Sequence, residues 1–231
     1  MFIYNSNTTP AISHNNNIIF QINTNPEFFN FPIPIESRLY YSETIVFPTI
    51  SPYKRKDFGF QGSSSSAELH YLGTGQAIYS QPVFPGNLLP HSLNYVLKDL
   101  WITAPFGSGL KIIGGGKFHT LSNLLIHSCK KCPFHLEAFD SGAIYSLYIL
   151  ENPNELPSII KAVHATHFYD LKYRHNDLQL LVEDYQGDIH GTIESNKKVG
   201  ATFQNVRRSN LDIWYENNNV ITVNGQKWLR F

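Results

Sequence analysis

A repeat of 24 residues constrains the fold of this chain more than any other feature of its sequence. Within residues 95–136 a strand-like run, a turn and a shorter run occur twice in succession. Leu100 and Leu124 hold the same place in the two copies, and Leu110 and Phe134 repeat at the same distance. A fixed period in the twenties indicates a solenoid, in which each repeat forms one coil that stacks on the next.

The same period continues to the end of the chain. Positions equivalent to Leu124 recur at steps of 21 to 24 residues, and a second run follows each of them. The further anchors are Leu147, Leu171, Thr192 and Ile213, and the second runs begin near Ile159, Leu178, Val199 and Val220. Glycine, asparagine and aspartate between the runs tolerate left-handed backbone angles and favour turns. The pattern predicts an all-β protein with very low helical content, a right-handed single-stranded parallel β-helix of about six or more coils.

The sequence before the repeat divides into an arm and a domain. We expect an irregular N-terminal arm at residues 1–35 and the β-helix domain at residues 36–231. The arm is rich in asparagine and has one strand-like run at residues 18–22, whereas Pro32 and Pro34 exclude a central strand from its apolar end. Such a segment either covers the open end of the β-helix or docks on a partner chain. Its candidate assembly residues are Phe28, Phe29 and Phe31.

The C-terminal end raises the same question. An uncovered sheet edge invites association with another chain. Trp228 and Phe231 follow the last coil directly. These aromatic side chains either fold back on that coil or become buried against another subunit, which makes them further candidate assembly residues.

Composition excludes several classes of partner. The chain has 18 basic and 18 acidic residues, so its charge does not favour nucleic acid or a membrane surface as a partner. The sequence has neither the pattern of a signal peptide nor an apolar stretch of membrane-spanning length. We therefore expect synthesis in the host cytoplasm without a signal peptide. No glycine-rich phosphate-binding motif is found, and we expect no cofactor.

Cys129 and Cys132 form a CxxC motif. A structural zinc site needs four ligands, and the sequence has no second CxxC motif. A redox CxxC stands at the start of a helix, which this position does not favour. The leading interpretation is a pair of thiols beside a turn. A metal site completed by His127 or His135 and a redox pair remain as alternatives.

Acidic residues are the candidates for catalysis. Glycoside hydrolysis needs two carboxyl groups at a set separation, and lyases need a base with a metal site. If the chain is an enzyme, the catalytic candidates are Glu137, Asp140, Glu183 and Asp184. Asp99 and Asp170 stand directly before anchor leucines, which is typical of a solvated position.

Aromatic residues at alternating strand positions are predicted to point outward. Exposed aromatic rows pack against other subunits or stack on sugar rings. We favour subunit packing over glycan contact as their role. The candidates are Trp101, Tyr145, Tyr148, Tyr173, Trp214 and Tyr215.

The repeating runs resemble the pectate-lyase-like right-handed β-helix superfamily. The resemblance covers about residues 36–225 and is carried by residues 97–102, 109–112, 121–129 and 144–149. It implies a fold rather than an activity, because this fold hosts many functions. The paired aspartates, the GHG motif and the RxK motif of its polysaccharide-cleaving members are absent.

Within that superfamily the chain is most similar to phage tail-fibre, tail-spike and virion-associated β-helix proteins. Many of these are trimeric and attach to the virion through a short N-terminal segment. The resemblance implies a non-enzymatic structural or receptor-binding component of a virion or extracellular assembly, a homotrimer docked to other virion proteins through residues 1–35. A polysaccharide lyase or hydrolase is the first alternative. The second is a module that binds a cell-surface glycan without cleaving it.

Overall fold

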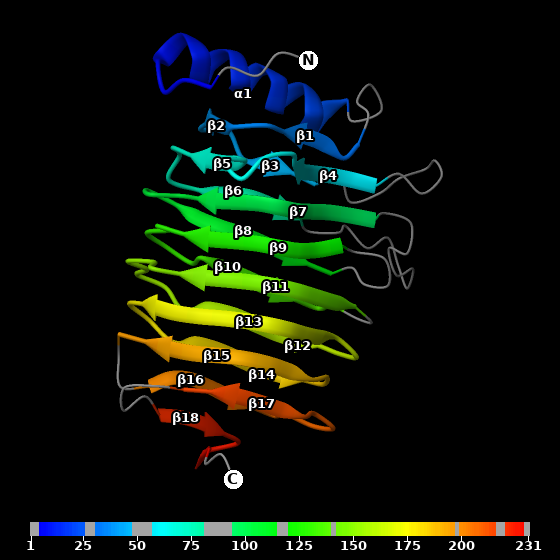
Figure 1. Ribbon diagram of the computed structural model, residues 1–231, viewed down its shortest axis with the longest axis vertical. Helices are drawn as coiled ribbons and strands as arrows, with labels where there is room; N and C mark the ends of the chain where they lie inside the picture. The colour runs from blue at the N-terminus through cyan, green and yellow to red at the C-terminus, as the bar shows by residue number, and fades with distance from the viewer. Residues whose placement is uncertain are drawn as a thin grey trace.

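The chain folds into a parallel β-solenoid whose coils stack along one axis (Figure 1). Six successive coils, from β7 and β8 to β17 and β18, each contribute one strand to each of two sheets, which confirms the predicted all-β parallel solenoid of about six coils. No helix among the described residues is long and apolar enough to cross a membrane. The computed structural model describes residues 5–25, 31–47, 57–80, 94–114, 120–139, 142–196, 199–215 and 220–228.

Sheet A consists of the first strand of each coil. Its strands are parallel. In the two coils that precede β7 the strand is split in two, as β1 with β2 and β4 with β5, so that β4 and β5 both pair with β7. The strands are β1 (Ile33–Ile35), β2 (Arg38–Tyr41), β4 (Asp57–Gly62), β5 (Glu68–Tyr71), β7 (Asn94–Thr103), β9 (Thr120–His127), β11 (Ala143–Leu150), β13 (His167–Asn176), β15 (Ile189–Ser195) and β17 (Leu211–Trp214).

Sheet B consists of the second strand of each coil. It is parallel apart from a final antiparallel hairpin between β18 and β19. The strands are β3 (Ile45–Val46), β6 (Gln76–Ser80), β8 (Ser108–Ile113), β10 (Phe134–Glu137), β12 (Ser158–Val163), β14 (Leu180–Tyr185), β16 (Val199–Gln204), β18 (Val220–Val223) and β19 (Gln226–Lys227).

The core is a continuous stack of apolar side chains between the two sheets. Leu100, Leu124, Leu147 and Leu171 pair in sequence across four coils of sheet A, and all are buried. Removing such side chains from water stabilises the fold by roughly 1.5–3 kcal/mol each. The predicted register, with steps of 24, 23 and 24 residues, is therefore confirmed through β13.

A row of left-handed residues accompanies the leucine stack, and we call it the bulge row. Each member directly precedes a stacked leucine, and the ladder pairing skips it. The members and their φ angles are Asp99 (56°), Asn123 (51°), Ser146 (49°) and Asp170 (61°). Left-handed angles cost about 1–2 kcal/mol for ordinary residues, and asparagine and aspartate tolerate them best.

The bulge row ends at β13, and this changes the register of the next strand. Leu171 pairs with Gly191, and Gly191 pairs with Ile213. The predicted anchor Thr192 is wrong by one residue, because β15 has no residue equivalent to Asp170. Gly191 fits here since a Cβ atom would lie 2.0 Å from the carbonyl oxygen of Leu171.

The N-terminal segment contains a helix, α1 (Thr9–Thr24), and the strand predicted at residues 18–22 is wrong. Pro10 lies in the first turn, where a helix tolerates proline. The buried residues Ala11, Asn15, Ile19 and Ile22 follow a helical spacing, so they form one face. That face lies on β2 and β3 at the end of the solenoid (Figure 1).

Asparagine side chains of α1 cover the edge of the first coil. The Asn16 side chain accepts a hydrogen bond from the Ser42 backbone N–H (2.8 Å), and its amide group donates to the Ser42 hydroxyl. Asn23 accepts from the Val46 backbone N–H and donates to the Thr44 carbonyl oxygen, both at 2.8 Å. These amides bond to backbone groups that would otherwise form an unpaired sheet edge.

Phe31 packs in the core of its own chain. Its ring centroid lies 4.2 Å from that of Phe58, and it contacts the buried core beside β1. Phe31 therefore has a role in the fold, and its role in assembly stays a prediction. The other two candidates of the arm, Phe28 and Phe29, lie outside the described residues.

Candidate functional site

The outward face of sheet A carries two rows of side chains across six coils. Both rows are set by the parallel register, which stacks equivalent side chains one coil apart. The tyrosine row contains Lys98, Ser122, Tyr145, Tyr169, His190 and Asp212. The tryptophan row contains Trp101, Leu125, Tyr148, Lys172, Thr192 and Trp214.

The tyrosine row contains a short aromatic stack. The rings of Tyr145 and Tyr169 are nearly parallel at 5.1 Å, and the His190 ring continues the stack 6.0 Å from Tyr169. Tyr145 and Tyr169 are 51% and 39% exposed. Aromatic rings in such a column present flat apolar surface beside polar groups.

Charged groups surround Tyr148 in the tryptophan row. The Tyr148 hydroxyl donates a hydrogen bond to Asp170 (2.6 Å), and the Lys172 ammonium lies 4.3 Å from the centroid of the Tyr148 ring. Lys172 and Asp170 also form an ion pair at 3.7 Å. The side chain of Tyr148 is thereby fixed in place, with a carboxylate and an ammonium beside it.

Exposed tryptophans stand at the two ends of the tryptophan row. Trp101 is 41% exposed and Trp214 is 60% exposed. They are separated by five ladder steps, a distance of about 24 Å at the usual spacing between strands. The surface between them therefore suits an extended ligand better than a compact one.

A buried carboxylate anchors the N-terminal end of this surface. Glu68 on β5 is 2% exposed, and it accepts hydrogen bonds from Arg38 Nε (2.5 Å), His70 Nδ1 (2.7 Å) and the Thr103 hydroxyl. Burial alone would raise the pKa of Glu68, but these donors outweigh it and lower the pKa to about 2. Glu68 is therefore ionised and links the strands β2, β5 and β7.

The hydrogen-bond network continues to the next coil. His127 on β9 contacts the Thr103 hydroxyl through Nε2 and the Ser128 hydroxyl through Nδ1, both at 3.1 Å. Burial lowers the pKa of His127 and so favours the neutral form of its imidazole. Its ring meets the Trp101 indole edge-on at 5.6 Å. The network thus fixes the wall on which Trp101 stands.

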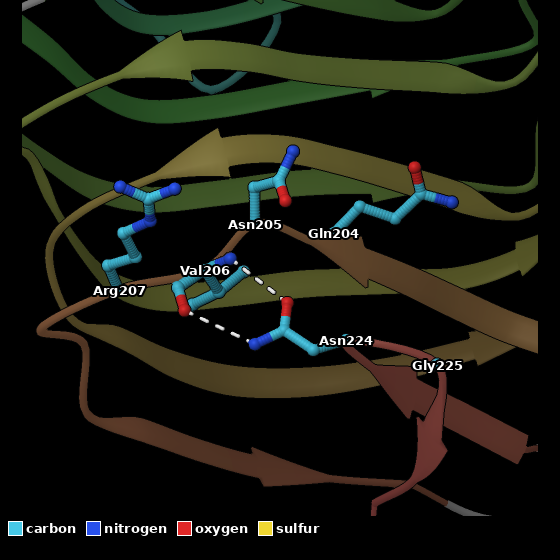
Figure 2. Close-up of a pocket in the computed structure, with 6 residues that line it drawn as sticks. All are labelled: Gln204, Asn205, Val206, Arg207, Asn224 and Gly225. Carbon is cyan, nitrogen blue, oxygen red and sulfur yellow. Dashed lines mark hydrogen bonds between the residues drawn. The ribbon is translucent and has the colours of Figure 1, made fainter.

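A polar hollow lies at the C-terminal end of sheet B, away from the two rows. It has a volume of about 420 Å³ and is open to solvent. Figure 2 shows the six residues that line it: Gln204, Asn205, Val206, Arg207, Asn224 and Gly225.

The structure separates the predicted aromatic candidates into two groups. Trp101, Tyr145, Tyr148 and Trp214 lie in the two outward rows. Tyr173 does not: it is fully buried and donates a hydrogen bond to the Leu178 carbonyl oxygen (2.6 Å). The prediction for Tyr173 is wrong because the bulge at Asp170 precedes it, so Leu171 and Tyr173 both point inward.

The C-terminal aromatic residues pack partly against the core of this chain. The Tyr215 hydroxyl approaches the carbonyl oxygen of Trp228 at 3.4 Å, and both side chains contact the buried core. This arrangement matches the alternative in which Trp228 folds back on the last coil. Phe231 lies outside the described residues.

The predicted carboxylates that the structure describes, Glu137, Glu183 and Asp184, lie on sheet B. Glu137 and Glu183 lie on sheet B on either side of Lys161, and Glu137 accepts a hydrogen bond from His135 (2.9 Å). Asp184 has a left-handed φ angle of 49° after Glu183 and lies 3.7 Å from His164. Asp140 lies outside the described residues.

Cys129 and Cys132 are free thiols beside the turn after β9. Burial raises the pKa of Cys129 to about 12 and that of Cys132 to about 11. Both thiols point to backbone carbonyl oxygens, of His127 and Phe134 respectively. Within the described part of the chain, no group of three or more histidine, cysteine or acidic residues is placed to hold a metal ion.

Sequence reasoning did not find the Glu68 network. Its members come from four strands, and only the register of sheet A brings them together. The available signal was the pairing of Glu68 with Trp101 and of His70 with Thr103 in adjacent coils, which requires the alignment of β5 with β7.

Comparisons of the chain with protein-family models, with curated proteins and with solved structures found no match. The function is therefore argued from the surface of the fold.

Proposed function

We propose that this chain is a non-enzymatic structural or receptor-binding component of a virion-like assembly, and that the outward face of sheet A binds a surface glycan. One observation carries the glycan proposal: four exposed aromatic residues lie on this single face, in two parallel rows. They are Trp101, Tyr145, Tyr169 and Trp214. The similarity of the repeating runs to tail-fibre and tail-spike β-helix proteins supports the assembly role.

The chemistry of the face suits sugar rings. A sugar ring presents a C–H face that stacks on an aromatic ring, while its hydroxyl groups seek donors and acceptors. Tyr148 and Lys172 in the tryptophan row, with Asp170 beside them, supply such groups. Because these side chains are held on a rigid ladder, little conformational entropy is lost on binding.

In the attachment role, the N-terminal end of the molecule contacts partner proteins. Helix α1 covers the first coil with one face, and its opposite side exposes Phe20, which is 63% exposed. An exposed large apolar residue at the end of a solenoid is a suitable contact for a docking partner. In this proposal the chain assembles as a homotrimer and docks through residues 1–35.

A glycan array with matched variants tests the binding role. We expect Trp214→Ala to weaken the signal of the wild-type ligand by about tenfold, because one stacking surface is removed. Phe106→Ala is the control, since Phe106 is 52% exposed but lies off the outward rows, in the turn before β8. Equal losses in the two variants, or release of reducing ends from the bound glycan, would contradict the proposal.

Light scattering tests the assembly role separately. A homotrimer has three times the mass of the 26.4 kDa chain. A mass of one chain at micromolar concentration, with residues 1–35 open to protease, would count against assembly. It would leave the glycan result intact.

A further inference from the structure

We propose that the hollow lined by residues 204–207, Asn224 and Gly225 binds a small hydroxycarboxylate. The ligand's carboxylate would lie on the guanidinium of Arg207, and its hydroxyl groups would bond to the amides of Gln204 and Asn205. This site is separate from the outward face of sheet A, and it does not depend on the proposed function.

The first support is an unbalanced positive charge. The guanidinium groups of Arg38 and Arg174 are each paired with a buried glutamate, Glu68 and Glu194. No ion pair engages the guanidinium of Arg207 within the described residues. A charged group left without a counterion at a concave surface favours an anionic ligand.

The nearest carboxylates along the ladder are already engaged. Glu183 pairs with Gln204 one coil away, but its carboxylate lies 3.6 Å from the Lys161 ammonium. Asp184 follows it and lies 3.7 Å from His164. Each acid therefore has a basic partner toward the N-terminus, and neither is tied to Arg207.

The second support is that the hollow is a built structure. The Asn224 side chain accepts a hydrogen bond from the Val206 backbone N–H (3.1 Å) and donates one to the Val206 carbonyl oxygen (3.3 Å), as Figure 2 shows. Val206 also packs against the core. Two-point bonding of this kind holds the turn after β16 against the turn after β18.

The third support is the direction of the polar side chains. Successive residues of an extended strand point to opposite faces, but Asn205 has a left-handed φ angle of 54°. Figure 2 shows Gln204, Asn205 and Arg207 extending to the same side of the turn. The space beside Gly225 is open, since a Cβ atom there would meet nothing within 4 Å.

These groups match the chemistry of a hydroxycarboxylate. A guanidinium binds a carboxylate through two parallel hydrogen bonds, and carboxamides both donate to and accept from hydroxyl groups. The volume of about 420 Å³ lies in the range of small-ligand sites. The same chemistry occurs in a free sugar acid and in an acidic residue of a larger glycan.

Calorimetric titration of the full chain tests the site. The probes are gluconate, methyl glucuronide, neutral glucitol and inorganic sulfate. We expect saturable binding of gluconate or methyl glucuronide, with glucitol and sulfate at least about tenfold weaker, because each lacks half of the recognised chemistry. Preference for gluconate identifies a free acid as the ligand, and preference for the glucuronide identifies a glycan residue. Either preference supports the proposal.

Two neighbouring arginines provide matched variants. Arg207→Ala should weaken binding by at least about tenfold, and Arg207→Lys by less, because lysine keeps the charge but loses the two-point contact. Arg208→Ala removes the same charge one residue away, outside the lining, and should change the affinity by less than about twofold. An unchanged urea midpoint in all three variants shows that they fold.

Three results would overturn the proposal. They are equal losses for Arg207→Ala and Arg208→Ala, binding of sulfate as tight as that of gluconate, and no saturable binding of either carboxylate. Trp214→Ala should leave this affinity unchanged, so the failure of one site is distinguishable from the failure of the other.

Discussion

The coils before and after β13 follow different rules, although they form one solenoid. From β7 to β13 each strand of sheet A carries a left-handed bulge residue before its core leucine. From β15 onward that residue is missing, and a glycine interrupts the leucine stack. The two regions thus differ by one residue per coil, the bulge residue, which the first region has and the second lacks.

Two buried carboxylates, one toward each end of the solenoid, are held by different sets of partners. On the N-terminal side Glu68 is held by Arg38, His70 and Thr103, which belong to three strands. On the C-terminal side Glu194 is bound through Nε and Nη2 of Arg174, both at 3.2 Å, in the adjacent strand. The Glu68 contacts thus join the strands β2, β5 and β7.

The largest expected effect is that of removing the charge of Glu68. Glu68→Gln keeps the shape but weakens three hydrogen bonds to a buried anion, and we expect a loss of about 3 kcal/mol in the free energy of unfolding. Urea denaturation measures it. Glu137→Gln is the control: its carboxylate is also bonded to a histidine, but 31% of the side chain is exposed, so the loss should stay below about 1 kcal/mol. Similar losses in both variants would refute a special role for the network.

The pH dependence of stability tests whether Glu68 stabilises the fold through its charge or through its shape. The folded pKa of Glu68 is about 2 and its ordinary value is 4.5, so its contribution is complete above pH 4.5 and is lost as the pH falls toward 2. The difference in stability between the wild type and Glu68→Gln should narrow over that interval. Burial lowers the pKa of His127, so protonation of this residue also opposes folding in acid. A constant difference between pH 6 and pH 2 would contradict the ionised state of Glu68.

The sequence predicted the bulged coils better than the rest because their repeat length varies by only one residue, with steps of 24, 23 and 24. Leu100, Leu124, Leu147 and Leu171 keep their spacing, so apolar periodicity locates every strand of that region. The anchor after Leu171 was misplaced because the loss of one bulge residue leaves the apolar pattern almost unchanged. The left-handed φ angles of the bulge row are a property of the backbone, and the spacing of apolar residues in the sequence does not predict them.

The ends of the molecule were less predictable for a different reason. Helix α1 is stabilised by hydrogen bonds from the side-chain amides of Asn15, Asn16 and Asn23 to the first coil. Asparagine itself has a low intrinsic helix propensity. The Glu68 network likewise depends on contacts between residues far apart in the sequence. Both features arise from tertiary contacts, which local patterns do not encode.

A smaller effect tests why the leucine stack is interrupted. In Gly191→Ala the new Cβ atom would lie 2.0 Å from the Leu171 carbonyl oxygen, so the backbone must shift. We expect a loss of about 1–3 kcal/mol in unfolding free energy, the usual cost of overpacking. Thr192→Ala, one residue along and outward, should cost less than about 1 kcal/mol. If Gly191→Ala is as stable as the wild type, the interruption does not come from close backbone contact.

The smallest effect tests the bulge row itself, through two serines that differ in backbone angle. Ser146 has a φ angle of 49°, where glycine relieves about 1–2 kcal/mol of strain but loses about 0.5–1 kcal/mol to greater freedom when unfolded. Ser146→Gly should therefore stabilise the fold by about 0.5 kcal/mol. Ser122 pairs with Lys98 and Tyr145 within regular ladders, so Ser122→Gly loses only conformational entropy and should destabilise it by about 0.5–1 kcal/mol. Opposite signs in parallel urea titrations would confirm that the bulge is imposed by the fold of these coils, and equal signs would show that the left-handed angle at Ser146 carries no strain.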